Sequence, residues 1–296
     1  MRLKLKLAVR DWDYLTPLAL GDVKPEGLEL EVDRVESVPD WSQRNDYDAG
    51  EVSFSQYVQG QAGAGYPLHC LPHFMMRGFR HRCMLTRSNS PVTRLEELGG
   101  KRIGITGWPD SGNTWTRALL RRVGVGINDV HWLVERLIAE QPGQRSLIGL
   151  LKSADLDVVF TPFLPPEFFN EDSGLRFLLP DFRREELCYF EQVGYVPGIH
   201  LLGVRPQLCD DHPWVAAALS EAFEESARVW ANKRMKYADT TPWLIDDIAR
   251  TKSQLPADWN ANGLESNEKM IDDFAAELYE QRIVDKRLDA KALFAH

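Results

Sequence analysis

Apolar and polar residues alternate along the first part of the chain. Residues 3–9 alternate leucine with basic residues before an Ala-Val pair, and residues 28–32 alternate again after a Pro-Glu-Gly turn at 25–27. A period of two is typical of a strand with one buried face. Residues 47–54 are predicted to form a further short strand that leads into a helix from Ser55. The chain is therefore expected to begin with strands followed by a helix.

A regular succession of strands and helices is predicted for the middle of the chain. Residues 93–98 are expected to form a short helix with Thr93 as its cap and Glu96 completing a capping box, and Gly99-Gly100 would end it. The segments after this helix alternate in type: strands at 101–106, 130–134 and 157–160, and helices at 113–123 and 146–152. Such repetition favours a doubly wound α/β fold.

Two strands, at 82–87 and 194–204, are expected to cross between two halves of the molecule. From residue 212 onward the pattern is almost entirely helical, and the last helix is predicted over 266–279 with Ser266 as its cap. A chain of 296 residues is near the size at which one core stops growing. We therefore predict two lobes: residues 1–85 with 205–296, and residues 86–204.

Composition narrows the partners and the compartment. The net charge is −9 and no basic run exceeds two residues, which argues against nucleic acid as a partner. No run approaches the roughly 18 apolar residues of a membrane span, so no membrane partner is expected. The N-terminal pattern predicts a strand rather than a secretory signal, and the four cysteines show no zinc or redox spacing. These features predict a cytoplasmic protein, and they leave formation of a homo-oligomer open.

Arg80, His81 and Arg82 form the sharpest polar constellation. An arginine fork matches a carboxylate, and charge-assisted hydrogen bonds of this kind contribute about 1.5–3 kcal/mol. Strict strand alternation would place His81 on the face opposite both arginines. We therefore predict a turn that enters a strand, with Arg80 and His81 reaching the ligand cleft and Arg82 outside. The alternative is a solvated basic loop.

Glu51, Ser53 and Ser55 lie where the predicted strand meets a helix. Either serine is explained by an ordinary N-cap, although a helix N-terminus also offers N–H groups to an anion. Glu51 is harder to explain as a structural residue if it points inward. A carboxylate there would orient Arg80 or accept the proton of a phenolic hydroxyl.

The loop at 110–114 and His200 complete the set of candidates. Ser111, Asn113 and Thr114 are candidate donors to a carboxylate, with Trp108 or Trp115 as an aromatic wall, and an ordinary helix cap is the alternative. His200 lies on a predicted crossing strand. A lone histidine there is either a satisfied core residue or a catalyst.

Two sets of motifs resemble known proteins. Residues 95–105 resemble the D-L-x-G-K-R-V-G-V segment that opens the second lobe of type II periplasmic binding proteins. Within that α/β fold, the chain resembles the 4,5-dihydroxyphthalate decarboxylase family. This second likeness is carried by residues 10–13 with 21–30, 47–57, 77–81 and 197–200. The chain departs from the family after Asp13, where Tyr14 and Leu15 stand in place of an Arg-Thr pair.

The resemblance implies a fold of two lobes with a ligand cleft between them. It also implies an enzyme of aromatic acid degradation. This enzyme would be a carboxy-lyase that removes CO2 from a hydroxylated aromatic carboxylate. It implies that His81 or His200 acts as the acid, and that the other histidine or Glu51 acts as the base. Arg80 would hold a carboxylate that stays on the ring, or would first hold the one that leaves. Asp13 belongs to a matching motif and is included in the substrate site. No organic cofactor is required. Whether a divalent metal ion binds at Glu51 and the histidines is left open.

Three alternatives share this fold. A solute receptor for a small carboxylate would use the same cleft without an acid or a base. Other enzymes on the scaffold, such as chorismate dehydratase or the dihydroxynaphthoate synthase of menaquinone biosynthesis, also handle small carboxylates; the Arg80-His81 pair favours the decarboxylases. A ligand sensor without catalysis is the third.

Overall fold

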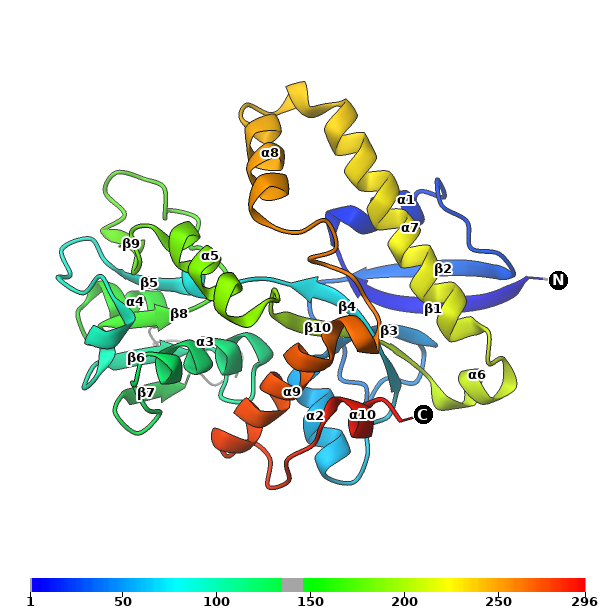
Figure 1. The fold of residues 1–296 in the computed structure, drawn as a ribbon, viewed down its shortest axis with the longest axis horizontal. Coiled ribbons are helices and arrows are strands. Elements are labelled where there is room, and N and C mark those ends of the chain that lie inside the picture. The colour runs from blue at the N-terminus through cyan, green and yellow to red at the C-terminus, as the bar shows by residue number, and fades with distance from the viewer. Residues whose placement is uncertain (1, 135–145, 296) are drawn as a thin grey trace. The chain divides into compact units, whose positions relative to one another are not determined.

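The computed structural model describes residues 2–134 and 146–295, which divide into two compact units (Figure 1). The first unit comprises Met1–Arg77, His200–Glu268 and Ala290–His296. The second comprises Gly78–Ile199 and Lys269–Asp289. Each unit is built on its own five-stranded sheet.

The sheet of the first unit has the strand order β2-β1-β3-β10-β4. Its strands are β1 (Leu3–Arg10), β2 (Leu28–Val35), β3 (Ala49–Ser53), β4 (His69–Arg77) and β10 (Gly198–Val204). β1 runs parallel to β2 and β3, whereas β10 runs antiparallel to β3. The antiparallel register pairs His200 with Ser53 and Leu202 with Glu51.

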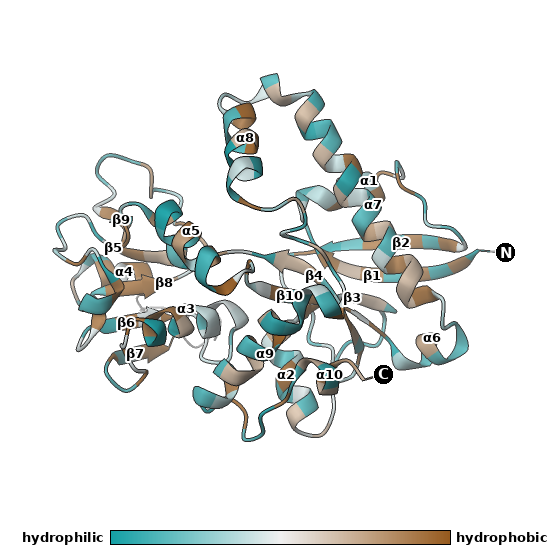
Figure 2. Cartoon of the chain, viewed as in Figure 1, coloured by the Kyte–Doolittle hydropathy of each residue, from teal (hydrophilic) through white to brown (hydrophobic). Residues whose placement is uncertain are grey.

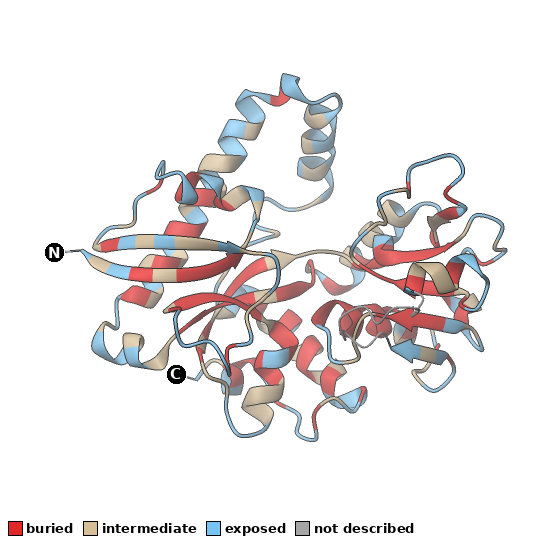
Figure 3. Cartoon of the chain, turned by 180° about the vertical axis from the view of Figure 1, so that it is seen from behind, coloured by how far each residue is buried: buried red, intermediate tan, exposed pale blue. Residues whose placement is uncertain are grey.

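Helices bury one face of this sheet through the apolar side of β1. Leu5, Leu7 and Val9 share a core with buried residues of α1 and α7. The last turns of α7 and all of α8 bury almost nothing, and Figure 3 shows them mainly pale blue and tan. The helices of this unit are η1 (Asp13–Leu15), α1 (Thr16–Ala19), α2 (Phe54–Ala62), α6 (Pro206–Asp211), α7 (Val215–Lys236), η4 (Ala238–Thr240), α8 (Leu244–Gln254) and α10 (Ala290–Leu293).

The sheet of the second unit has the order β7-β6-β8-β5-β9. Its strands are β5 (Met84–Arg87), β6 (Arg102–Ile105), β7 (His131–Val134), β8 (Val158–Phe160) and β9 (Leu175–Phe177). β6 is parallel to β7 and β8, and β5 is antiparallel to β8 and β9. β8 is apolar throughout, as its brown colour in Figure 2 shows, and both faces of the sheet are covered.

Alternate side chains of these strands enter two separate cores. Met84 and Phe160 pack with buried residues of α3 and α5, whereas Leu85 and Val159 pack with those of α4. The helices of this unit are η2 (His81–Cys83), η3 (Leu95–Leu98), α3 (Ser111–Arg122), α4 (Leu147–Lys152), α5 (Phe182–Val193) and the greater part of α9 (Leu264–Glu280), which begins in the first unit.

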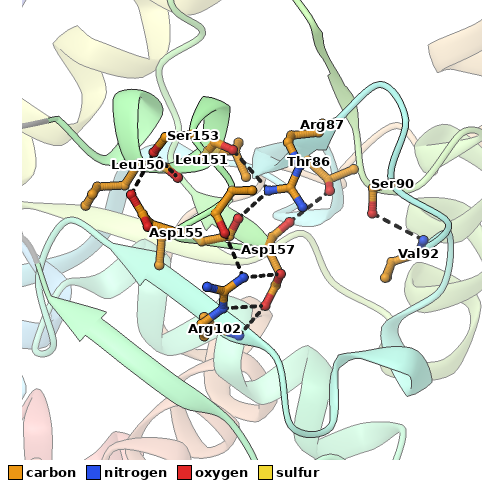
Figure 4. A network of polar contacts seen from close by, with 12 residues as sticks. Thr86, Arg87, Ser90, Val92, Arg102, Leu150, Leu151, Ser153, Asp155 and Asp157 are labelled. Carbon is orange, nitrogen blue, oxygen red and sulfur yellow. Dashed lines mark hydrogen bonds and ion pairs between the residues drawn. The ribbon is translucent and has the colours of Figure 1, made fainter.

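A polar network at one end of the second sheet joins β6, β8 and β5 (Figure 4). The Arg102 side chain donates to Asp157 from Nε at 3.1 Å and from Nη2 at 2.9 Å. Arg87 donates to the carbonyl oxygens of Leu151 and Leu156, and the Thr86 hydroxyl donates to the Asp157 carbonyl. These bonds tie β5 to carbonyl groups at the end of α4 and in the segment that leads into β8.

The unit boundaries differ from those expected from sequence. The chain leaves the first unit at the end of β4, so residues 82–87 lie wholly in the second unit instead of crossing between the two. The second crossing does lie in β10. Residues 269–289 were expected in the first lobe but belong to the second unit. Phe274 packs on Trp115 with ring centroids 5.0 Å apart, and Asp273 accepts a hydrogen bond of 2.7 Å from Tyr195.

Two local expectations also need correction. Residues 95–98 form a 3-10 helix, and Glu97 rather than Glu96 accepts the backbone N–H groups of Thr93 and Arg94. The last long helix begins at Leu264, before the expected cap Ser266. Within the described part of the chain, none of the helices combines the length and apolar character that a membrane span requires.

Candidate active site

A buried carboxylate, Glu51, is the centre of a polar group in the first unit. Its side chain on β3 is fully excluded from solvent. The backbone N–H of Arg10 donates to Oε2 at 2.9 Å, and the Arg10 Nε donates to Oε1 at 3.0 Å. The indole N–H of Trp12 donates to Oε2 at 3.1 Å. Both carboxylate oxygens are therefore occupied by donors from the end of β1.

His200 joins this group from β10. Glu51 and Ser53 lie on the same face of β3, and the register places His200 opposite Ser53, so the imidazole is a diagonal neighbour of the carboxylate. The His200 Nδ1 contacts both the Glu51 Oε1 and the Arg10 Nη2. A neutral imidazole nitrogen either donates or accepts. An ionised Glu51 can only accept and the Arg10 guanidinium can only donate, so each tautomer of His200 satisfies one of these two contacts, and Nε2 makes no hydrogen bond to the described residues.

The surroundings of Glu51 keep it ionised. Burial alone would raise its pKa, but the hydrogen bond and charge of His200, the charge of Arg10 and the Arg10 backbone N–H together lower it to about 2. The Arg10 guanidinium also stacks over Trp12, with its central carbon 4.5 Å from the ring centroid. We expected Glu51 to orient Arg80 or to act as a base. The structure shows a different cation, Arg10, beside a carboxylate that has no free oxygen.

The turn predicted at Arg80 to Arg82 is present in the second unit. Residues 81–83 form η2, which leads into β5. Arg80 and His81 are 3% and 4% exposed, whereas Arg82 is exposed. The turn and the exposed Arg82 agree with the prediction, because a 3-10 turn removes the strict alternation of a strand. Whether Arg80 and His81 reach a ligand cleft stays a prediction.

The Arg80 guanidinium lies against the first turn of α3. A methyl group added at Gly112 would be 2.6 Å from the Arg80 Nη2 and 2.9 Å from Cζ. The Arg80 Nε is buried without a hydrogen-bond partner, and no acidic side chain of the described residues forms an ion pair with Arg80. The free N–H groups of a helix N-terminus carry partial positive charge. The Asp110 carboxylate already accepts one of these N–H groups, that of Asn113, so the guanidinium of Arg80 is the group that favours an anion here.

His81 lies beside this feature as a neutral side chain. Its ring meets the Tyr189 ring edge-on with centroids 5.5 Å apart. Burial lowers the pKa of His81 to about 4, and Nδ1 has no partner among the described residues. A neutral imidazole can accept or donate one hydrogen bond, but it does not supply a second cation near Arg80.

Several predicted donors are used inside the protein. The Asn113 amide donates to Thr106 Oγ1 and the Gly107 carbonyl, both at 3.0 Å, and the Thr114 hydroxyl donates to the Asp110 carbonyl. These bonds use the donor groups of Asn113 and Thr114 to hold the loop before α3, while the Asn113 Oδ1 is buried without a partner among the described residues. Asp110 caps α3 by accepting the Asn113 backbone N–H.

The aromatic and serine candidates have separate environments. Trp108 stacks against the Arg117 guanidinium at 4.2 Å, and Trp115 is buried and donates to the Gly198 carbonyl. Ser111 is buried in the first turn of α3. Ser55 is buried, and its hydroxyl accepts a hydrogen bond from the Gln59 amide. Ser53 is half-buried and lies opposite His200 in the sheet. Asp13 is exposed in η1. Neither Asp13 nor Trp115 is placed by its own unit beside a predicted catalytic side chain.

Arg10 and Trp12 are the functional candidates that sequence reasoning did not assign. Both lie in the stretch 10–13 that carried part of the family resemblance, but no spacing rule joins them to Glu51, which is 41 residues from Arg10. Within residues 2–134 and 146–295, no cluster of three or more His, Cys, Asp or Glu side chains is arranged to hold a metal ion.

Comparison with known proteins defines first the class and then the nearer relatives. The fold is that of the type II periplasmic binding proteins. The aliphatic sulphonate binding protein SsuA of Escherichia coli superposes with a TM-score of 0.61 at 16% identity, covering 98% of this chain and 91% of that one. In sequence, the chain is similar to the 4,5-dihydroxyphthalate decarboxylase of Comamonas testosteroni, at 28% identity over 99% of this chain and 96% of that protein.

A second relative has the same activity in its name. The 4,5-dihydroxyphthalate decarboxylase of Pseudomonas putida is 27% identical over 66% of this chain and 84% of its own length. No protein-family model matches the chain. The resemblance to the 4,5-dihydroxyphthalate decarboxylases, first based on short motifs, is thus confirmed and extends over the whole chain.

Proposed function

We propose that this protein is a non-oxidative decarboxylase of a hydroxylated aromatic carboxylate of the 4,5-dihydroxyphthalate type. The observation that carries the proposal is the buried Glu51–His200 pair braced by Arg10, because it presents one imidazole nitrogen for proton transfer. Similarity to two decarboxylases along the chain supports the reaction class.

The reaction requires one proton at a ring carbon and no redox change. The ring carbon that bears the leaving carboxylate takes up a proton while an ortho or para hydroxyl releases electron density to the ring. The bond from that carbon to the carboxylate then breaks, its electron pair returns to the ring, and CO2 leaves. A positioned acid or base typically contributes 10²–10⁴-fold to such a step.

His200 is the proposed acid–base residue. Its Nε2 makes no hydrogen bond to the described residues, while Nδ1 is held by Glu51. In the protonated form, Nε2 would deliver the proton to the ring carbon; in the neutral form, it would accept the proton of the phenolic hydroxyl. Glu51 is a positioning residue in this proposal, because both of its oxygens already accept hydrogen bonds and it is fully buried.

Arg80 and the first turn of α3 would bind a carboxylate that stays on the ring. An arginine that held the leaving carboxylate would stabilise the ground state and slow the loss of CO2, since CO2 is neutral. Arg80 is buried and has no acidic partner in the described residues, so its charge is available to a ligand.

No organic cofactor is needed for these proton transfers, and the proposed partner is a small aromatic carboxylate. The cation beside Glu51 and His200 is the Arg10 guanidinium, which occupies the position where a metal ion would have to contact both side chains. We therefore propose that the reaction also proceeds without a metal ion.

The test is CO2 release from a panel of hydroxybenzoates and hydroxyphthalates by the purified protein. The proposal predicts release from a dihydroxyphthalate, and loss of release in Arg80→Met and His200→Gln, with His73→Gln as a control histidine of the first unit. His73 is buried against Phe223 and hydrogen-bonded to Ser220. If several of these acids raise the melting temperature but none loses CO2, the protein is a receptor or sensor and the proposal fails.

A further inference from the structure

Two exposed phenylalanines lie on the segment that follows β8 in the second unit. The side chains of Phe163 and Phe169 are 71% and 79% exposed, whereas Phe168 is buried in the core that contains residues of α4. A single apolar side chain at the surface needs no explanation by itself. The two exposed rings differ, however, in the groups that the fold places beside them.

β8 is the middle strand of its sheet, and its two neighbours lead to the two groups around the Arg80 guanidinium (Figure 1). β6 runs parallel to β8 with Ile105 opposite Phe160, so the loop before α3 leaves the sheet at the end of β8. β5 runs antiparallel to β8 with Met84 opposite Phe160, so η2 lies at the same edge. The segment after Phe160 therefore emerges between η2 and the loop before α3. In open α/β sheets, ligands bind at this edge, outside the carboxyl ends of the parallel strands.

Backbone hydrogen bonds join this segment directly to the turn that carries Arg80. The Thr161 N–H donates to the Cys83 carbonyl at 2.8 Å, and the Cys83 N–H donates to the Arg80 carbonyl at 3.0 Å. The Arg80 Nη2 lies against Gly112 in the first turn of α3, on the β6 side of β8. The guanidinium therefore extends across the edge from which the Phe163 segment emerges.

The position of Phe163 is fixed from both sides. Its backbone N–H donates to the hydroxyl oxygen of the buried Thr161 at 3.2 Å, and the ring of Pro162 restricts the backbone between them. On the other side, Leu164 packs against the core that contains Phe168. The Phe163 ring is thus held in solvent by an anchored turn, so little conformational entropy is lost when a ligand contacts it.

We propose that Phe163 is a substrate-binding residue, and that its ring packs against the aromatic ring of a ligand whose carboxylate is bound by Arg80. The guanidinium recognises a carboxylate, but it does not distinguish an aromatic acid from an aliphatic one. Offset or edge-to-face contact between two aromatic rings adds attraction beyond the burial of apolar area. Phe163 therefore selects aromatic acids. This inference deepens the proposed function and rests on the carboxylate site at Arg80.

The test is isothermal titration calorimetry of the full-length protein at pH 7 with 3,4-dihydroxybenzoate, which retains one carboxylate and one aromatic ring. We expect Phe163→Ala to weaken binding about tenfold. Phe163→Leu keeps an apolar side chain but loses the ring, and it should weaken binding about threefold or more. Phe163→Tyr keeps the ring and should bind within about twofold of the wild type. Circular dichroism checks that each variant is folded.

Phe169→Ala is the matched control, because Phe169 is the same residue type with a similar exposure on the same segment. Its ring meets Phe168 with centroids 5.2 Å apart, and the nearby Glu167 pairs with Lys152 of α4 at 2.7 Å. The surroundings of Phe169 thus belong to α4 and not to η2. Phe169→Ala should bind 3,4-dihydroxybenzoate as the wild type does.

Phe163→Ala that binds as tightly as the wild type, while Arg80→Met does not bind, would overturn the inference and leave the carboxylate site intact. Equal weakening by Phe163→Ala and Phe169→Ala would also overturn it, because the effect would not be specific to the edge next to η2. No binding by the wild type, or binding unchanged in Arg80→Met, would overturn the proposed site at Arg80 and the inference with it. The two failures are therefore distinguishable in one set of titrations.

Discussion

Replacing Glu51 by glutamine tests the polar group of the first unit most severely. The substitution keeps the shape of the side chain but removes the charge that faces Arg10 and His200. The pKa of Glu51 is about 2, against an ordinary value of 4.5, which corresponds to about 3 kcal/mol of stabilisation at neutral pH. Breaking a buried ion pair by removing one partner independently costs about 3–5 kcal/mol. We expect Glu51→Gln to lower the free energy of unfolding by about 3 kcal/mol.

The pH dependence of this loss follows from the direction of the shift. A carboxyl group whose folded pKa is depressed stabilises the fold fully above its unfolded pKa, and this contribution is lost as the pH falls through the folded value. The stability gap between the wild type and Glu51→Gln should therefore be constant above about pH 5. It should narrow steadily between about pH 4 and pH 2.

Urea unfolding followed by tryptophan fluorescence at pH 7 and pH 3 measures the gap. Glu29→Gln is the control, because Glu29 pairs with Lys4 at the surface and should change stability by less than about 1 kcal/mol. CO2 release by Glu51→Gln should also fall by about 10²-fold or more, since the Glu51 carboxylate no longer contacts the His200 Nδ1. A stability within about 1 kcal/mol of the wild type at pH 7 would refute this account of the buried group.

Three further predictions concern the two candidate groups. Gly112→Ala should weaken binding of 3,4-dihydroxybenzoate about tenfold, because the added methyl group displaces the Arg80 guanidinium. Gly107→Ala is the control and should not weaken binding, because its methyl group would be 3.8 Å from the nearest atom. Trp12→Phe removes one donor to Glu51 and should lower the unfolding free energy by about 1 kcal/mol in urea titrations. Incubation with EDTA should leave CO2 release unchanged, and loss of activity that is restored by a divalent ion would contradict the metal-free proposal.

Much of the fold could be predicted from sequence because the signals are local. Alternation over residues 3–9 and 28–32 predicted β1 and β2, and the helix that follows β3 begins within one residue of the expected Ser55. The turn at residues 80–82 was predicted because a turn is the simplest way to place Arg80 and His81 on one side. Assignment of residues 269–289 failed because an amphipathic helix pattern does not state which core receives its apolar face.

The bonding within the site was less accessible from sequence. Glu51 and His200 were predicted as candidates, but they are 149 residues apart and meet only through the register of β3 and β10. The role of Arg10 depends on a different register, that of β1 and β3, which pairs Ala8 with Gly50. Asn113 has the chemistry of a ligand donor, yet its amide nitrogen donates to Thr106 and Gly107 within its own loop. Such competition between a ligand and the backbone cannot be decided by residue type.

The most direct test of the central claim compares CO2 release from 4,5-dihydroxyphthalate by the wild type and by His200→Gln at pH 7, with protein concentration and folding matched by circular dichroism. The account predicts steady release by the wild type and a rate at least about 10²-fold lower for the variant, while 3,4-dihydroxybenzoate still binds to both. Equal rates in the two proteins would show that the Glu51–His200 pair does not carry the chemistry, and no release by the wild type would contradict the proposed reaction itself.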